Sequence, residues 1–153
     1  TGNIKNEKTL YTDAALIYKE LLYDYKERDV IVYGTSLGSG IASYVAYNNH
    51  PCKLILETPY YSILDVAESR FPVFPVKQLL KYKILSYQFI KKTECPVLML
   101  HGTQDQVVPY ESAKKLYDVS LKEKTTFITL EGGGHGNLST FENYHLQIDK
   151  MLR

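Results

Sequence analysis

A chain of 153 residues is long enough for one domain with a sizeable core, and 44% apolar and 23% charged residues are typical of a globular protein. The formal net charge of +1 gives no reason to expect nucleic acid or an acidic membrane as a partner. No apolar run reaches the roughly 18 residues of a membrane span, and no signal peptide is visible.

The cysteine content favours a reducing compartment. Cys52 and Cys95 are too few for a disulfide framework, and each lies beside a proline at the start of a predicted strand. We therefore expect two reduced, buried thiols near one end of a sheet, with a disulfide between them as the alternative. Reduced thiols together with the absence of a signal peptide predict a cytoplasmic location.

Taken in chain order, the sequence alternates between helical and strand patterns. Apolar residues at helical spacing predict a first helix with Thr9 as its N-cap; they are Leu10, Ala14, Ile17, Leu21 and Tyr25. Short, nearly continuous apolar runs predict strands at residues 30–33, 54–56, 96–100 and 125–130. Further helices are predicted at residues 39–49, 63–70, 76 to about 89 and 111–121, and a last one with Leu138, Phe141, His145, Ile148 and Leu152 on one stripe.

Strands that alternate with helices, each strand apolar almost throughout, are typical of a parallel sheet that is covered on both faces. We find no internal repeat, low-complexity tract or linker. The prediction is a single α/β domain over residues 1–153.

The first predicted strand leads into a Gly-x-Ser-x-Gly turn, and a helix rich in small residues follows. This context is typical of a nucleophile elbow, in which a strained turn presents one serine, here Ser36. We expect side chains at Gly34 and Gly38 to collide with the neighbouring strand or helix. Ser36 would lie at a helix N-terminus, where free N–H groups favour developing negative charge.

A serine nucleophile needs a base and a group that orients the base. Asp105 directly follows the third predicted strand and His135 follows the fourth, as Ser36 follows the first. All three should therefore lie at the carboxyl edge of the sheet, in the chain order Ser, Asp, His. Each also has a simpler interpretation, since the aspartate could serve an Asx turn and the glycines around the histidine could form only a flexible link.

The other candidate residues have weaker support for a catalytic or binding role. Glu57 ends the second predicted strand and is the alternative orienting acid. The remaining histidines, His50, His101 and His145, are interpreted as structural. No Cys, His, Asp or Glu group has metal-ligand spacing, and the glycines at 132–134 are not followed by the Lys-Ser/Thr of a phosphate loop, so neither metal nor cofactor is predicted.

Three motifs carry a resemblance to a known superfamily. They are Tyr33-Gly34-Thr35-Ser36-Leu37-Gly38, the segment from His101 to Pro109, and Gly133-Gly134-His135-Gly136-Asn137. With these motifs the chain resembles serine hydrolases of the α/β-hydrolase superfamily, in particular its small esterase-like and peptidase-like branch. The similarity extends over essentially the whole chain.

The resemblance implies a role for each matching position. Ser36 would be the nucleophile, His135 the base and Asp105 its orienter, and the Leu37 backbone N–H would be one oxyanion-hole donor. Tyr60 and Tyr61 would line the pocket. The substrate would be a small-molecule or peptide ester, thioester or amide, cleaved through an acyl-enzyme without a cofactor.

The chain departs from the family at its start, because the family's N-terminal strands and second oxyanion donor have no counterpart here. We therefore expect the C-terminal part of an α/β-hydrolase fold, with about four strands, whose N-terminal half is missing and is supplied in cis or in trans. A homodimer through the exposed strand edge is possible on this view. The alternative functions are a non-catalytic binding or assembly module, and a transferase or lyase on the same fold.

Overall fold

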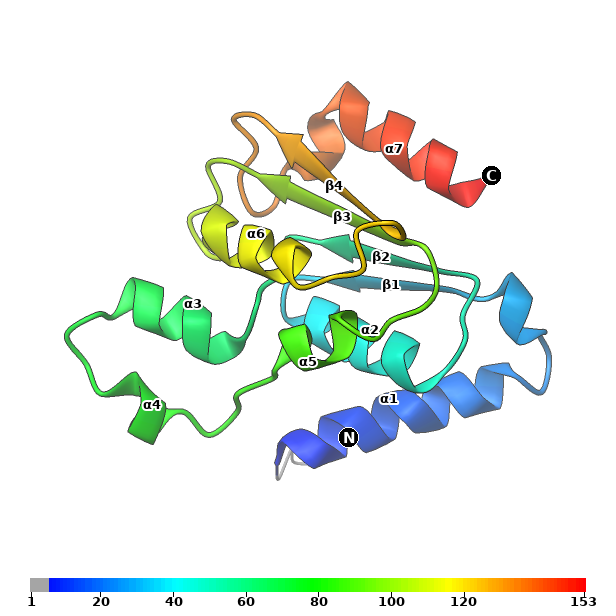
Figure 1. Cartoon of the computed structure of the whole chain (residues 1–153), viewed down its shortest axis with the longest axis horizontal. Coiled ribbons are helices and arrows are strands. Elements are labelled where there is room, and N and C mark those ends of the chain that lie inside the picture. Colours follow the sequence, from blue (N-terminus) through cyan, green and yellow to red (C-terminus); the bar gives the residue numbers. More distant parts are fainter. Residues whose placement is uncertain (1–5) are drawn as a thin grey trace.

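The computed structural model describes residues 6–153 and contains one four-stranded parallel sheet, with the strands side by side in chain order (Figure 1). The strands are β1 (Ile31–Thr35), β2 (Lys53–Glu57), β3 (Val97–Gly102) and β4 (Thr125–Leu130). Their register places Thr35 beside Glu57 and Gly102 beside Leu130, so the strands end close together at one edge. The predicted fold class is confirmed, with each strand within two residues of its predicted bounds.

Helices connect the strands. They are α1 (Glu7–Leu21), α2 (Leu37–Asn48), α3 (Ile63–Arg70), α4 (Val76–Leu79), α5 (Ser86–Ile90), α6 (Tyr110–Asp118) and α7 (Glu142–Leu152), with 3-10 turns η1 (Glu27–Asp29) and η2 (Leu138–Thr140). In the described part of the chain, no helix combines the length and apolar character needed to cross a membrane.

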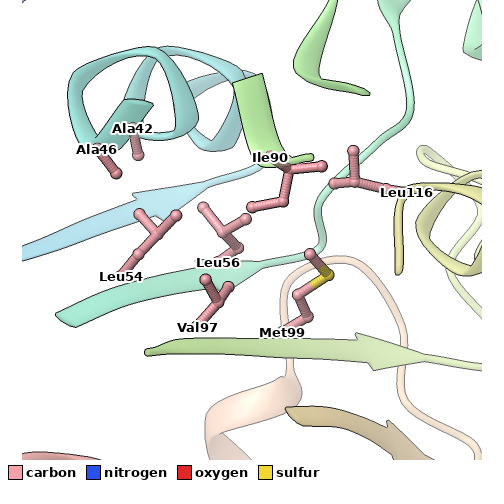
Figure 2. Close-up of a cluster of buried hydrophobic side chains, with 8 residues drawn as sticks. All are labelled: Ala42, Ala46, Leu54, Leu56, Ile90, Val97, Met99 and Leu116. Atoms are coloured by element: carbon pink, nitrogen blue, oxygen red, sulfur yellow. The ribbon is translucent and has the colours of Figure 1, made fainter. Parts of the chain in front are cut away.

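The core follows from the alternation of side chains along the strands. Leu54 and Leu56 of β2 point to one face, where α2, α5 and α6 cover them, while Ile55 points to the other face, which η2 and α7 cover. Figure 2 shows the first of these clusters, made of Ala42, Ala46, Leu54, Leu56, Ile90, Val97, Met99 and Leu116. Burial of each large side chain there stabilises the folded state by roughly 1.5–3 kcal/mol.

The first helix begins earlier than predicted. Asn6, not Thr9, is the N-cap, because the Asn6 side chain accepts a hydrogen bond from the Thr9 backbone N–H at 3.0 Å. The predicted apolar stripe is only partly covered: Ile17 is 71% exposed, and with Leu21 it lines an open hollow of about 570 Å³ between α1 and β1. β1 is an edge strand, with β2 as its only partner among the described residues.

The single helix predicted over residues 76–89 is wrong. α4 ends at Leu79, and α5 begins only at Ser86. Between them the backbone N–H groups of Lys83 and Ile84 donate to the carboxylate of Glu7, at 3.0 and 2.8 Å, instead of to helical carbonyls. Ile84 takes a φ of 31°, a conformation that a β-branched residue rarely adopts.

The last helix and the cysteines also differ in part from expectation. Leu138 lies in η2 and Leu152 is 55% exposed, so the face of α7 that packs on the sheet is formed by Tyr144, Ile148 and Met151. Both cysteines are free thiols and only partly buried. Burial raises the pKa of Cys95 to about 11. The strand register pairs Leu54 with Val97, so Cys52 and Cys95, each two positions earlier, lie at the same end of the sheet, as expected.

Candidate active site

Ser36 stands between the last residue of β1 and the first residue of α2, in a strained backbone conformation. Its φ of 50° and ψ of −122° lie outside the regions that non-glycine residues prefer, which costs on the order of 1–3 kcal/mol. Two hydrogen bonds hold the turn: the Ser36 N–H donates to the Glu57 carbonyl and the Ser39 N–H to the Ser36 carbonyl, both at 2.9 Å. The surrounding backbone therefore fixes the serine at the carboxyl end of β1.

Close packing explains one of the two motif glycines. A Cβ at Gly34 would lie 2.5 Å from Ala42 Cβ and 2.7 Å from the Gly38 carbonyl oxygen. The same prediction for Gly38 is wrong, because no atom lies within 4 Å of the corresponding position. Gly40, to which the motif assigns no packing role, is packed as closely, because a Cβ there would collide with the side chains of Tyr60 and Ile84.

Asp105 and His135 are in direct contact. His135 Nδ1 lies 2.8 Å from Asp105 Oδ2, which leaves the other ring nitrogen, Nε2, available to a third group. The Asp105 side chain is fully buried, and its Oδ1 accepts hydrogen bonds from the backbone N–H groups of Val107 and Val108, each at 2.8 Å.

Asp105 is held in its ionised form. Burial alone would raise its pKa, but hydrogen bonds from His101, His135 and the two backbone amides outweigh burial and lower the pKa to about 2. The His101 contribution was not expected from the sequence. This buried histidine lies with Nε2 3.4 Å from Asp105 Oδ2 and 3.1 Å from the Val108 carbonyl oxygen, so one N–H supports both the carboxylate and its loop.

The acid and histidine loops meet through their backbones. A Cβ on Gly102 would overlap the Gly133 main chain, and the Gln104 N–H donates to the Gly133 carbonyl at 2.8 Å. The Gly134 N–H in turn donates to the Asn137 side chain at 2.7 Å. Gly102 and Gly133 thus permit a close approach of the two loops that side chains at these positions would block.

The structure brings two of the three predicted residues together and places the third at the same sheet edge. Ser36, Asp105 and His135 follow β1, β3 and β4, whose carboxyl ends lie side by side. Among the described residues, Ser36 Oγ has no hydrogen bond to His135. Leu37, the predicted oxyanion donor, is the first residue of α2, so its N–H has no partner within that helix.

The two tyrosines predicted to line a pocket occupy different environments. Tyr60 is only 1% exposed and its hydroxyl donates to the Leu37 carbonyl at 3.1 Å, so it supports the elbow from within the core. Burial raises its pKa. Tyr61 is partly buried and stacks on Tyr87 with ring centroids 4.5 Å apart, beside a hollow of about 210 Å³.

Glu57 makes no contact with His101 or His135, the two histidines beside Asp105. Its carboxylate accepts hydrogen bonds from the hydroxyls of Tyr33 and Tyr144, the latter at 3.1 Å. The geometry therefore favours Asp105 over Glu57 as the acid that orients His135.

An apolar cavity of about 330 Å³ lies next to the elbow. Leu37 forms part of its wall, together with Leu10, Ile63, Leu79, Leu80, Lys81, Tyr82 and Ile84. These residues come from distant parts of the chain, and only their tertiary arrangement identifies them as one site.

Comparisons with known proteins agree with this architecture. A family described as an alpha/beta hydrolase domain matches residues 5–150. A putative alpha/beta hydrolase of Acanthamoeba polyphaga mimivirus is 31% identical over 140 residues, which cover 89% of this chain and 51% of that protein. A lysophosphatidylserine lipase of Danio rerio, ABHD12, is 27% identical over 142 residues, covering 78% of this chain and 36% of the relative.

A solved structure shows the same fold. The monoacylglycerol lipase of Paleococcus ferrophilus superposes with a TM-score of 0.67 at 16% identity, covering 93% of this chain and 74% of the lipase. The chain spans about half the length, or less, of the two relatives described above. On the match to residues 5–150 and the shared fold, the chain belongs to the alpha/beta hydrolase family.

Proposed function

We propose that the chain is a serine hydrolase that cleaves a carboxylic ester, thioester or amide through an acyl-enzyme on Ser36. The observation that carries this proposal is the 2.8 Å contact between His135 Nδ1 and the buried Asp105 carboxylate, at the sheet edge where the strained turn presents Ser36. A buried pair of this kind is the usual means of activating a serine hydroxyl.

Each group has a defined task in the reaction. Asp105 stays ionised and accepts a hydrogen bond from His135 Nδ1–H, which fixes the ring so that His135 Nε2 can take the proton from Ser36 Oγ as the oxygen attacks the substrate carbonyl carbon. The Leu37 N–H donates to the oxyanion that forms. His135 then gives its proton to the departing alcohol, thiol or amine, and a water activated by the same nitrogen hydrolyses the acyl-enzyme.

The cavity beside Leu37 suits an apolar acyl group. Its wall is formed mainly by leucine and isoleucine side chains, and its volume of about 330 Å³ lies within the range of small-molecule sites. The names of the relatives, which include a lysophosphatidylserine lipase and a monoacylglycerol lipase, are consistent with an apolar ester as substrate.

Labelling with a fluorophosphonate probe, followed by peptide mass spectrometry, tests the proposal. We expect the label on Ser36, and its loss in Ser36→Ala and His135→Ala. Ser69→Ala, which removes an exposed serine at the end of α3, is the matched control and should label normally. Labelling that persists in His135→Ala, or no labelling of a chain shown to be folded by circular dichroism, would contradict a serine hydrolase activity of these 153 residues.

A binding or assembly module is the second candidate. The open edge of β1 and the hollow of about 570 Å³ beside α1 favour it, because an unpaired apolar strand edge readily pairs with another chain. Light scattering coupled to size-exclusion chromatography distinguishes the two: a stable dimer without labelling at Ser36 supports assembly, and a labelled monomer supports the hydrolase.

A further inference from the structure

The segment from Arg70 to Lys83, here called the apolar arm, exposes large apolar side chains. It comprises the end of α3, the loop that follows, α4 and the stretch after it. The exposed fractions are 56% for Phe71, 87% for Val73, 60% for Phe74 and 71% for Leu79.

The apolar arm projects from the body of the molecule. Figure 1 shows α3 and α4 standing out on the side to which the strand arrows point, with the loop between them at the outermost edge. Phe71 and Phe74 touch edge to face, with ring centroids 6.3 Å apart, but nothing else in the described chain covers them sufficiently to bury either ring. A group of exposed large apolar residues on one projection marks an interaction surface.

All charged residues of the apolar arm are basic. Arg70, Lys77, Lys81 and Lys83 are all exposed, and no Asp or Glu occurs between residues 70 and 83. Over the whole chain the 18 basic residues are balanced by 17 acidic ones. The small net charge therefore conceals a local basic cluster, which two carboxylates adjoin: Glu68 beside it in sequence, and Glu7, which accepts a hydrogen bond from the Lys83 backbone N–H at 3.0 Å.

Both ends of the apolar arm connect to the candidate active site. The Arg70 guanidinium donates to the backbone carbonyls of Val107 and Asp105, at 3.3 and 3.5 Å. At the other end, Leu79 and Leu80 form part of the wall of the apolar cavity that Leu37 also lines. The projecting surface is thus continuous with the cavity beside the elbow.

We propose that the apolar arm docks the protein on a membrane surface that carries anionic lipids. Phe71, Val73 and Phe74 enter the boundary between headgroups and acyl chains, and the lysines contact the anionic headgroups. A protein partner would need only the apolar patch, whereas the excess of four cations over the adjoining carboxylates of Glu7 and Glu68, together with the apolar cavity, fits a surface of anionic lipids. Docking does not depend on the proposed hydrolysis, but it would bring the cavity to lipid-borne acyl groups.

Co-sedimentation with vesicles tests the proposal, using phosphatidylcholine alone and phosphatidylcholine mixed with phosphatidylserine. We expect binding to the mixed vesicles and much weaker binding to the neutral ones. Phe71→Ser with Phe74→Ser should lower the partition coefficient at least about tenfold, since two aromatic rings no longer enter the interface. Replacing Lys77, Lys81 and Lys83 with glutamine should lower it on the order of a hundredfold, at about fivefold per cation.

Matched controls separate the apolar arm from other exposed residues. Tyr23→Ser with Tyr25→Ser removes two aromatic rings that are 74% and 58% exposed elsewhere, and should leave binding unchanged. Exchange of Lys91, Lys92 and Lys124 for glutamine makes the same change in net charge and should have a smaller effect.

Three outcomes would overturn the proposal. They are absence of binding to the mixed vesicles, binding that the phenylalanine variant retains, and binding that is lost instead in Ile17→Ser, which alters the exposed face of α1. Ser36→Ala should bind vesicles like the unaltered chain, and the phenylalanine variant should label with fluorophosphonate in solution like the unaltered chain. Failure of docking and failure of the proposed hydrolysis are therefore observed separately.

Discussion

The two glycines of the elbow motif should respond in opposite ways to the same substitution. In Gly34→Ala the new Cβ would lie 2.5 Å from Ala42 Cβ, 2.7 Å from the Gly38 carbonyl oxygen and 2.9 Å from Ser39 Cα. Carbon atoms prefer separations of about 3.5–4.0 Å, so α2 would have to move away from β1 by several tenths of an ångström or more. Such overpacking typically costs about 1–3 kcal/mol of unfolding free energy.

Gly38→Ala places its Cβ in open space within the first turn of α2. Alanine is favoured over glycine in a helix by roughly 0.5–1 kcal/mol, so this variant should be as stable as the unaltered chain or slightly more stable. The difference between the two variants is therefore expected to be about 2–4 kcal/mol, or a separation of melting temperatures of roughly 4–16 °C for a chain of this size.

Urea unfolding followed by far-ultraviolet circular dichroism measures this difference directly. Both variants should keep the denaturant slope of the unaltered chain, which shows that the same surface is exposed on unfolding. If Gly38→Ala loses as much stability as Gly34→Ala, the argument from close packing is refuted, and both glycines serve the motif for another reason.

Two further predictions concern carboxylates that accept backbone hydrogen bonds. Asp105 has a pKa of about 2 in the folded chain against an ordinary 3.8, so its ionised form stabilises the fold by roughly 2 kcal/mol above about pH 4, and this contribution is lost as the pH falls toward 2. The difference in unfolding free energy between the unaltered chain and Asp105→Asn should therefore shrink over that range; a difference independent of pH would contradict the assignment. Glu7→Ala removes the acceptor of the Lys83 and Ile84 amides and should cost about 1–3 kcal/mol, with faster hydrogen exchange at the buried Ile84 amide. Glu20→Ala, the same change in charge on an exposed part of α1, is the control, and equal losses in both variants would contradict the argument.

The sheet could be predicted because the pattern that identifies each strand lies within the sequence of that strand. Each buried strand of a parallel sheet is a short apolar run, and β4 was predicted with the bounds that the structure shows, Thr125–Leu130. The positions of Ser36, Asp105 and His135 followed from a simple rule, since residues that directly follow parallel strands lie at one edge of the sheet.

What the sequence did not indicate depends on contacts between distant residues. The helix predicted over residues 76–89 is interrupted where Lys83 and Ile84 donate to Glu7, which lies more than 70 positions earlier. Tyr60 follows the second strand, where a pocket residue is expected, but its hydroxyl donates a hydrogen bond to the Leu37 carbonyl inside the core. The apolar cavity beside Leu37 likewise exists only when α1, α3 and the apolar arm are brought together.

The backbone contact between Gly102 and Gly133 has a consequence for sequence variation. Because the Gln104 N–H bonds to the Gly133 carbonyl, the spacing between the acid and histidine loops is set by main-chain atoms. Exposed side chains such as that of Gln104 can therefore be exchanged without moving the carboxylate relative to the imidazole, whereas the Glu131 carboxylate accepts a hydrogen bond from the Thr103 hydroxyl across the two loops. Exposed positions of the two loops could thus be varied in a library of substitutions while the acid–histidine pair keeps its geometry.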